Sequence, residues 1–377
     1  MKMKILVLNY EFPPVGGGGG KVAEDICRKL TQKGHLVRVQ TSYARGLMKN
    51  EKRDGYQIFR SFSFRRRRDR CSVLEMAAFI LTNFFPALKH VVLWKPDIIH
   101  VHFAVPTGVL SYFINLLTGI PYVLTAHLGD VPGGVPEQTD TIFKFIKPFT
   151  NLIWKRASVV TAVSDFTRKL ALVSYDVDVQ TIYNGIDLNL CNQSPIKLQK
   201  PVRLIYAGRF NPQKNLLFLI ELLNRVKDLE WRLDMPGNGP LMPLIQQEIK
   251  IKHLEDRINL HGWIDSGEVN SLLSHSDILV LPSLTEGLPV VGINAIGHGL
   301  AILGSDTGGI RDLVPKNKNG WLCPVNDFEA FEQAFRYMVS SSGELMRMKR
   351  ASRELSQKFD LTKIIEQYET IFKKVIT

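Results

Sequence analysis

The sequence predicts an α/β protein made of two doubly wound domains, each with a mostly parallel sheet. Apolar, strand-like segments alternate with amphipathic, helix-like segments along the whole chain, which is the pattern of repeated βα units. A chain of 377 residues is too long for one ordinary core and suits two domains of similar size. The composition, 45% hydrophobic and 22% charged, is that of a globular protein.

The first βα series predicts an N-terminal domain over residues 1–190. Helices are expected at about 19–33 and 108–117, between strands that the apolar segments place at 4–10, 35–43, 56–64, 97–103, 121–128 and 158–165. Residues 191–201, polar and bounded by proline, are the predicted interdomain linker.

The second series predicts a C-terminal domain over 202–358. Its expected strands lie at 202–209, 231–237, 258–263, 277–283 and 301–306. The last segment, 359–377, contains a strongly amphipathic helix.

Cysteine usage and hydropathy indicate a protein of the reducing cytosol. The four cysteines are far apart and form no CxxC pair, so neither a disulfide framework nor a cysteine metal cluster is expected. The basic and apolar N-terminus is too short in its apolar part for a signal peptide and is predicted to be a strand. No apolar run is expected to reach the roughly 18 residues of a membrane-spanning helix.

The net charge of +12 is concentrated in the N-terminal half. Residues 1–190 hold 25 basic and 15 acidic side chains, whereas the remainder holds 23 and 21. Nucleic acid and an anionic membrane surface are the two partners that such a charge suits. Nucleic acid is disfavoured because the arginine run at 64–70 adjoins an apolar helix and has no interleaved stacking aromatics.

That arginine run predicts a peripheral membrane contact. Basic residues beside an apolar, aromatic helix are typical of interfacial helices, with arginines at lipid headgroups and aromatics in the acyl boundary. The expected contact residues are Arg65, Arg66, Arg67, Arg68, Phe84 and Phe85, with Phe79 and Trp94 on the same helix. The alternative is a solvated charge run followed by an ordinary core helix.

Residues 279–314 predict a ligand site in the C-terminal domain. They contain a strand, a turn with the lone acid Glu286, a helix start, a second strand and the pair Gly308 and Gly309. Open α/β sheets bind ligands outside the carboxyl ends of their strands, and a helix N-terminus offers free amides to an anion. A carboxylate accepts hydrogen bonds from hydroxyls. The combination indicates a polyhydroxylated, phosphorylated ligand.

Two cations strengthen this prediction. Arg209 ends a strand and Lys214 lies near the next helix start, so both belong to one strand-to-helix corner. Such a pair suits a diphosphate. With Glu286 in the same half, the residues favour a nucleoside diphosphate that carries a sugar.

Two further features belong to the N-terminal half. The glycines at 16–20 follow the first strand and open a helix, which is the position of a phosphate-contacting loop, but the spacing fits neither the dinucleotide fingerprint nor the P-loop. A merely flexible turn is the alternative. His127 follows a strand, where a neutral imidazole can hydrogen-bond a sugar hydroxyl; a structural histidine is the alternative. His100 and His102 lack metal-ligand company and are interpreted as sheet residues.

Several segments in order resemble the group 1 retaining glycosyltransferases of the GT-B fold. They are GGGGGK, TAHLGD, IYNGID, AGRFNPQKN, PGNGP, HGW and EGLPVVGIN followed by GSDTGG, and they cover essentially the whole chain. The resemblance implies that sugar is transferred from a nucleotide donor with retention of configuration, without a cofactor or an obligatory metal. It also implies that the C-terminal helix packs back on the N-terminal, acceptor-binding domain.

The resemblance assigns roles to individual residues. Arg209 and Lys214 would hold the diphosphate, His127 would contact the donor sugar and Glu286 would bind the sugar hydroxyls. Backbone near Trp263 and Ile264 would hold the base, and Gly16 and Gly17 would meet phosphate and acceptor. The remaining expected donor-binding residues are Gly208, Gly237, Gly287, Leu288, Pro289, Val290 and Asn294.

Asn294 departs from the family pattern. The motif has a second glutamate there, which usually holds the ribose, and asparagine keeps an acceptor but loses the charge. Losing a charge-assisted hydrogen bond weakens binding by roughly 1 to 2 kcal/mol. An inactive relative is therefore one alternative that the sequence leaves open.

The function expected is transfer of a hexose or N-acetylhexosamine, from a donor expected to be uridine-linked, to a lipid-linked or polysaccharide acceptor in envelope glycan assembly. The expected location is the cytoplasmic face of the membrane. A sugar-nucleotide epimerase of the same fold and a catalytically silent nucleotide-sugar-binding protein are the alternatives.

Overall fold

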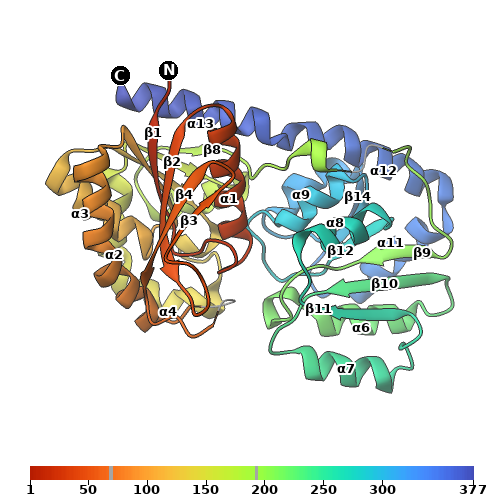
Figure 1. The fold of residues 1–377 in the computed structure, drawn as a ribbon. Coiled ribbons are helices and arrows are strands. Elements are labelled where there is room, and N and C mark those ends of the chain that lie inside the picture. Colours follow the sequence, from red (N-terminus) through yellow and green to blue (C-terminus); the bar gives the residue numbers. More distant parts are fainter. Residues whose placement is uncertain (68–70, 192–193) are drawn as a thin grey trace. The chain divides into compact units, whose positions relative to one another are not determined.

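The protein consists of two compact units. The computed structural model describes residues 1–67, 71–191 and 194–377, with the backbone alone for 136–145. The N-terminal unit comprises Met1–Gly185 and Leu361–Thr377, and the C-terminal unit comprises Ile186–Asp360. Each unit is an α/β sandwich around its own sheet (Figure 1).

The sheet of the N-terminal unit has, within the described residues, the strand order β3-β4-β2-β1-β5-β6-β7-β8. All pairs are parallel except β3 with β4 at the edge, an antiparallel addition that the sequence did not predict. The order turns back between β1 and β5. The strands are β1 Lys4–Leu8, β2 Leu36–Tyr43, β3 Asn50–Arg53, β4 Tyr56–Phe62, β5 Ile98–His102, β6 Tyr122–Ala126, β7 Val159–Ala162 and β8 Val179–Thr181.

Alternate side chains of these strands face two helical layers. Leu6, Leu8, Ile99 and Val101 share a core with α2, α3 and α4, so His100 and His102 point to the other face. There His100 lies against two aromatic rings of α13. The helices are α1 Gly18–Gln32, α2 Val73–Trp94, α3 Thr107–Thr118, α4 Pro136–Arg156, α5 Asp165–Ser174 and α13 Leu361–Ile376.

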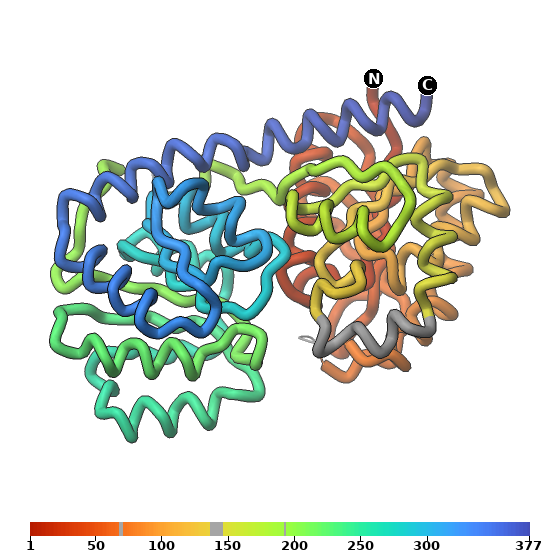
Figure 2. Tube along the Cα trace, turned by 180° about the vertical axis from the view of Figure 1, so that it is seen from behind, coloured from red at the N-terminus to blue at the C-terminus, as the bar shows by residue number. Residues whose placement is uncertain are grey.

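The C-terminal helix α13 is therefore a part of the N-terminal unit. It contacts α1, and its Glu369 accepts hydrogen bonds from Lys33 and from His35, the latter at 2.8 Å. The two ends of the chain consequently lie side by side in this unit (Figures 1 and 2).

The sheet of the C-terminal unit is parallel, with the order β11-β10-β9-β12-β13-β14. The order turns back between β9 and β12, whose residues pair directly. The strands are β9 Val202–Ile205, β10 Trp231–Pro236, β11 Ile258–Gly262, β12 Ile278–Leu281, β13 Ala301–Ser305 and β14 Gly320–Cys323. The helices are α6 Leu216–Arg225, α7 Met242–Ile251, α8 Ser266–Ser274, α9 Val290–Gly297, α10 Ile310–Leu313, α11 Phe328–Ser340 and α12 Ser342–Ser356.

Helix α2 corrects the expectation that no apolar segment is long enough to cross a membrane. Among the described residues it is the one helix long and apolar enough, by length and composition, to cross a membrane. It is also an integral layer of its unit: a Ser72 and Glu75 capping box starts it, and buried Asn83 accepts a 2.7 Å hydrogen bond from Gln40 of β2. Only 22% of its most apolar stretch is buried. The helix therefore combines a packed face with an exposed apolar one.

A buried ion pair joins α12 to Asp277, the residue before β12. Lys349 Nζ lies 2.6 Å from Asp277 Oδ1, and the two side chains are 5% and 0% exposed. Lys349 also donates to the carbonyl oxygen of Lys197, and Asp277 accepts from the amides of Gln199 and Arg203. These bonds tie the predicted linker segment to the sheet.

Replacing Lys349 by methionine should leave Asp277 buried without its counter-charge. We expect the free energy of unfolding of the C-terminal unit to fall by about 3 to 5 kcal/mol, as for other buried pairs that lose one partner. Urea denaturation followed by tryptophan fluorescence measures the change. Arg347→Met, which breaks the exposed pair with Glu344, is the control and should cost about 1 kcal/mol or less. Equal losses in the two variants would contradict the assignment.

Candidate functional site

The predicted ligand residues of the C-terminal unit gather where its strand order turns back. Arg209 and Lys214 follow β9, and Glu286 follows β12, its neighbour in the sheet. The carboxyl ends of the two strands flanking such a switch point leave a crevice in which open α/β sheets bind their ligands. The chain thus brings both cations and the carboxylate to the binding edge of one sheet.

Lys214 and Glu286 form an ion pair. Lys214 Nζ donates to Glu286 Oε1 at 2.5 Å, and Ser283 Oγ donates to the same oxygen at 2.8 Å. Glu286 is 6% exposed, so its charge is largely shielded from water. From the described residues Oε2 receives no hydrogen bond. One oxygen of this carboxylate is therefore fixed by the protein and the other is free to accept.

Backbone contacts explain why two segments far apart in sequence meet here. The short 3₁₀ turn Pro212–Lys214 is joined to the loop after β12 by a 2.8 Å bond from the Leu284 amide to the Gln213 carbonyl. The Gln213 side chain donates in return to the Thr285 carbonyl at 2.9 Å. Lys214 is consequently held beside Glu286 by the loops themselves and not only by charge.

The glycine pair after β13 packs against the same loop. The Gly309 amide donates to the Glu286 carbonyl at 2.9 Å. A Cβ on Gly309 would lie 1.5 Å from the Gly287 carbonyl oxygen, and one on Gly308 would lie 2.0 Å from that of Glu286. Only glycine permits this approach. The two strand ends and the start of α9 that the sequence placed together do lie together.

A second close glycine contact lies beside Arg209, where the chain leaves β9. Gly208 and Gly237 follow β9 and β10, and a Cβ on Gly237 would lie 1.9 Å from the Gly208 carbonyl oxygen. Buried Tyr206 donates its hydroxyl to the Arg209 carbonyl at 2.8 Å. Burial and the nearby Glu286 charge raise the pKa of that hydroxyl well above its usual value. The half-buried Arg209 side chain makes no hydrogen bond or ion pair through its guanidinium with the described residues.

Helix α9 begins at Val290 with Pro289 as its N-cap, and no side chain caps its first amides. Leu288 is buried and Asn294 is half-buried one turn into the helix. Trp263, after β11, is 63% exposed, and Ile264 beside it is half-buried. Free amides at a helix start favour an anion, and an exposed indole offers a stacking surface.

The glycine loop of the N-terminal unit lies at the other switch point, after β1. Gly16 has φ +97°, and a Cβ there would lie 2.5 Å from Glu11 Cβ. The Gly17 amide donates to Glu11 Oε2 at 3.1 Å. That amide is therefore bound within the protein, whereas the amides of Gly18 to Gly20, in the first turn of α1, have no acceptor in the helix.

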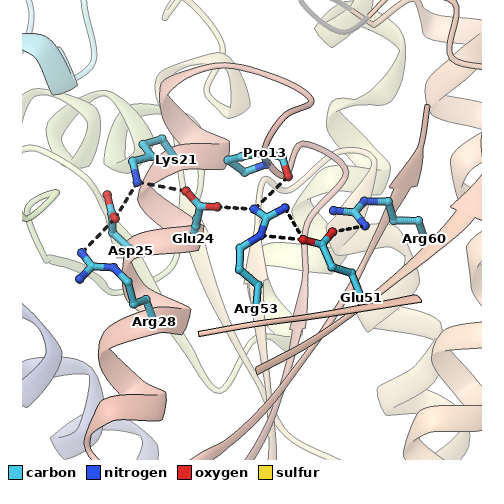
Figure 3. Close-up of polar contacts among 8 residues, drawn as sticks. All are labelled: Pro13, Lys21, Glu24, Asp25, Arg28, Glu51, Arg53 and Arg60. Atoms are coloured by element: carbon cyan, nitrogen blue, oxygen red, sulfur yellow. Dashed lines mark hydrogen bonds and ion pairs between the residues drawn. The ribbon is translucent and has the colours of Figure 1, made fainter. Parts of the chain in front are cut away.

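Ion pairs hold α1 and the loop to the edge strands (Figure 3). Arg53 of β3 pairs with Glu24 of α1 at 2.6 Å and donates to the carbonyl of Pro13, just before the loop. Arg53 also pairs with Glu51, which binds buried Arg60 of β4 at 2.7 Å. The edge strand that the sequence missed therefore positions the start of the glycine loop.

His127 lies near this loop and is 8% exposed. Its ring stacks on Phe103 with centroids 4.3 Å apart, and its Nε2 is 3.3 Å from His102 Nδ1. A Cβ on Gly19 would lie 3.3 Å from His127 Cε1. The structure thus brings together His127 and the glycine segment. Burial lowers the pKa of His127 to about 4, so the imidazole is neutral at pH 7.

Asp130 orders the backbone around His127. Its two carboxylate oxygens accept from the amides of Ala104 and His127, both at 2.8 Å. Burial raises the pKa of Asp130 to about 7 despite these bonds. Its role is to join the segments that follow β5 and β6.

The predicted membrane residues divide into two groups. Arg66, Arg67 and Phe85 are exposed, and Arg68 lies outside the described residues. The prediction that Arg65 contacts the membrane is wrong. Its buried guanidinium donates to the Tyr10 carbonyl and lies 3.6 Å from Glu11. Phe79, Phe84 and Trp94 also pack wholly or partly in the core. A run of like charges does not reveal which member turns inward.

Residues that the sequence did not single out complete the two sites. Ser283, Gln213 and Tyr206 orient the Glu286 and Arg209 segments, while Phe103 and Glu11 support His127 and the glycine loop. Phe103 alone had a usable signal, because it is the last residue of the strand predicted at 97–103, beside the switch point. No group of three metal-ligating side chains occurs in the described ranges.

Acidification should destabilise the protein through its buried histidines. Burial lowers the pKa of His100 to about 3, that of His127 to about 4 and that of His102 well below normal. Between pH 6.5 and 4 the unfolded chain therefore binds protons that the folded chain excludes, and stability falls as pH falls. Asp130 acts in the opposite direction, because its raised pKa lets the folded chain bind a proton that the unfolded chain has released. It is one group against three histidines.

Melting temperatures at pH 7 and pH 5 test this expectation. The wild type should melt at a lower temperature at pH 5, and the decrease should be smaller in His100→Asn, which has one buried imidazole fewer. A variant with the same or a larger decrease would show that His100 does not contribute.

Comparison with known proteins assigns the family. Residues 16–190 match the model described as Glycosyltransferase Family 4, and residues 192–355 match that described as Glycosyl transferases group 1. A Bacillus anthracis protein named N-acetyl-alpha-D-glucosaminyl L-malate synthase is 27% identical over 393 residues, covering 100% of this chain and 98% of its own. An Escherichia coli protein named UDP-Gal:alpha-D-GlcNAc-diphosphoundecaprenol alpha-1,3-galactosyltransferase is 24% identical, with coverage of 74% and 75%.

The fold comparison agrees. The crystal structure of the Anabaena protein HepE in complex with UDP and glucose superposes with a TM-score of 0.78 at 19% identity, over 98% of this chain and 99% of that one. Two parallel-sheet α/β units of this kind are the GT-B architecture that the sequence predicted. The chain belongs to the group 1 glycosyltransferases of the GT-B fold.

Proposed function

We propose that this glycosyltransferase moves a hexose or N-acetylhexosamine from a uridine diphosphate sugar to a lipid-linked or polysaccharide acceptor in cell-envelope glycan synthesis, with retention of configuration. The observation that carries the proposal is the Lys214–Glu286 pair at the switch point of the C-terminal unit. The named donor and acceptor of the Escherichia coli relative and the UDP bound to HepE support the choice of substrates.

Each charged group has a task in this scheme. Arg209, which makes no ion pair with the described residues, and Lys214 would bind the diphosphate and offset the charge that grows on it as the bond to the sugar breaks. The Oε2 oxygen of Glu286, unoccupied by donors from the described chain, would accept from sugar hydroxyls while Oε1 stays bound to Lys214 and Ser283.

The reaction needs no carboxylate nucleophile from the protein. The acceptor hydroxyl would attack the anomeric carbon from the face that the diphosphate leaves, and a departing phosphate oxygen would take its proton. One carbon–oxygen bond breaks and one forms on the same face, so configuration is retained. The cations would supply the charge stabilisation that a metal ion supplies elsewhere, which is why we propose metal-independent transfer.

Asn294 would bind the ribose in place of the second glutamate of the family motif. It lies one turn into α9 and is half-buried. Its amide offers donors as well as an acceptor to the ribose hydroxyls. Trp263 and Ile264 would hold the base.

Two alternatives differ in measurable ways. An epimerase would release a changed sugar without an acceptor, so donor consumption with and without acceptor separates it from a transferase. A silent binding protein would bind donor in calorimetry without turnover on any acceptor. L-malate should be included in the acceptor panel, because the name of the Bacillus anthracis relative specifies that small hydroxy acid.

Removing either partner of the charged pair should strongly slow transfer. We expect Lys214→Met to lower the turnover number by about 100-fold or more, the usual loss when one group that stabilises developing charge is removed. Glu286→Gln keeps the shape of the side chain but weakens hydroxyl binding and should also lose most activity. The assay is UDP release from a panel of UDP-sugars that is first screened by thermal shift.

Glu248→Gln is the matched control for that experiment. Glu248 of α7 is a carboxylate of the same unit, paired with Lys252 just after that helix, and its change should leave the rate unaltered. Wild-type rates in both Lys214→Met and Glu286→Gln would end the assignment of the site.

We also propose that the protein works as a peripheral protein on the cytoplasmic face of the membrane. Its contact would be the exposed face of α2 with the basic residues before it. Arg66, Arg67 and Phe85 are exposed there, the last by 73%, and Leu74 and Leu81 by 82% and 75%. Arginines beside an apolar face match anionic headgroups above acyl chains.

Sedimentation with vesicles tests the membrane contact. The wild type should pellet with vesicles rich in phosphatidylglycerol at low salt and much less at high salt, since the attraction is screened. Arg66→Ser with Arg67→Ser should reduce binding by about 30-fold, because each charge contributes about 1 kcal/mol. Lys227→Ser with Arg232→Ser, exposed cations of the C-terminal unit, is the control. Equal pelleting of the two double variants would disprove the electrostatic contact.

A further inference from the structure

The imidazoles of His102 and His127 are in direct contact. His102 Nδ1 lies 3.3 Å from His127 Nε2, and the residues belong to the adjacent ends of β5 and β6. His102 is completely buried, whereas His127 retains 8% exposure. One ring is thus internal and the other reaches the edge of the sheet, where the glycine segment also lies.

Both rings are neutral at pH 7, and this restricts the contact. Burial lowers the pKa of each, and the neighbouring imidazoles lower that of His102 further. Two neutral imidazoles can share only one hydrogen in a nitrogen–nitrogen contact, so one donates and the other accepts. The tautomer of His127 is therefore tied to that of His102.

The unsatisfied nitrogen of His102 selects the direction of this bond. His102 Nε2 is buried and has no hydrogen-bond partner among the described residues. A buried N–H without an acceptor is a rarer and costlier defect than an acceptor that receives no bond. Neutral His102 therefore keeps its hydrogen on Nδ1 and donates to His127 Nε2. His127 must then carry its own hydrogen on Nδ1.

The contact also selects the orientation of the His127 ring. Turning the ring by 180° would exchange Nε2 for Cε1 and break the bond to His102. The Phe103 ring stacks on one face of the His127 ring with 24° between the two planes. It therefore blocks orientations of the imidazole between the two flips. Gly19 lies close to Cε1 and Phe103. The ring is therefore held in a narrow slot, and the bond to His102 chooses between the two flips that the slot permits.

We propose that His102 is a positioning residue that holds His127 in one flip and as the Nδ1–H tautomer, so that His127 presents an N–H donor to a hydroxyl oxygen of the donor sugar. This inference rests on the proposed function, in which His127 contacts that sugar. His102 itself touches no substrate and acts through the neighbouring ring. A neutral donor of this kind is compatible with the neutral polyol part of the ligand, whereas the cations serve the diphosphate.

Leucine and asparagine at position 102 provide a matched pair of variants. The two side chains have nearly the same shape, but asparagine keeps a polar atom near the position of Nδ1 and leucine does not. His100→Leu is the control, because His100 lies on the same strand and bonds Thr125 rather than His127. A purely structural role would make the two leucine variants behave alike.

Nitrogen-15 NMR of histidine-labelled full-length protein at pH 7 is the first measurement. The His127 signals, assigned by their loss in His127→Asn, should show the Nδ1–H tautomer in the wild type and in His100→Leu. In His102→Leu they should move toward a mixture of tautomers. A wild-type Nε2–H tautomer, or an unchanged His127 spectrum in His102→Leu, would overturn the proposal.

Kinetics provides the second readout. With UDP-N-acetylglucosamine and UDP-glucose as probes, kcat/KM for UDP release should fall by about tenfold in His102→Leu, as loss of one orienting hydrogen bond implies, and by less than about twofold in His102→Asn. Equal losses in both variants would overturn the proposal, and so would equal losses in the two leucine variants. If the wild type turns over no nucleotide sugar, the proposed function fails, while the NMR result still decides the tautomer.

Discussion

The buried charge of Glu286 is the constraint on which the site of the C-terminal unit depends. A carboxylate that is 6% exposed must have partners, because an uncompensated charge in the interior is costly. Lys214 and Ser283 supply them on one oxygen. The backbone bonds between Gln213, Leu284 and Thr285 then keep the lysine in place. The loops after β9 and β12 form one structure around a single charge.

Glycine makes this arrangement possible. The loop after β13 approaches the Glu286 carbonyl so closely that a side chain at Gly308 or Gly309 would overlap backbone atoms. Gly237 serves the same purpose beside Gly208. The segments after β12 and β13, and those after β9 and β10, are thus brought within backbone contact, which is closer than ordinary side-chain packing allows. The carboxylate, its lysine and the start of α9 lie at one edge of the sheet for this reason.

Much of this could be predicted from the sequence. The period of apolar residues gave the βα series, and both switch points follow once a doubly wound sheet is assumed. The antiparallel strand β3, NEKR, could not be predicted, because it has no apolar alternation and is held by pairing with β4 and by its ion pairs. The direction of Arg65 could not be predicted either. Neighbouring arginines look alike in a sequence, and only the position of Tyr10 and Glu11 turns this one inward.

The same limit applies to the glycine loop and to the histidines. The sequence does not show whether a backbone amide is free or bound. The hydrogen bond from the Gly17 amide to Glu11 could therefore not be predicted. Likewise, strand alternation places His100 and His102 on one face, but their different partners depend on the register of β5 with β6. In this register His102 is the backbone partner of Thr125, but the Thr125 hydroxyl bonds His100, and His102, nearer the strand end, lies beside His127.

The two units differ in the kind of polar chemistry that they offer. At the switch point of the C-terminal unit the groups are ionic, since Lys214 and Glu286 compensate each other and Arg209 remains half-exposed. In the N-terminal unit the residues around His127 are buried imidazoles whose lowered pKa values keep them neutral. Burial without a counter-charge leads to neutral donors and acceptors, whereas burial with a counter-charge preserves ions.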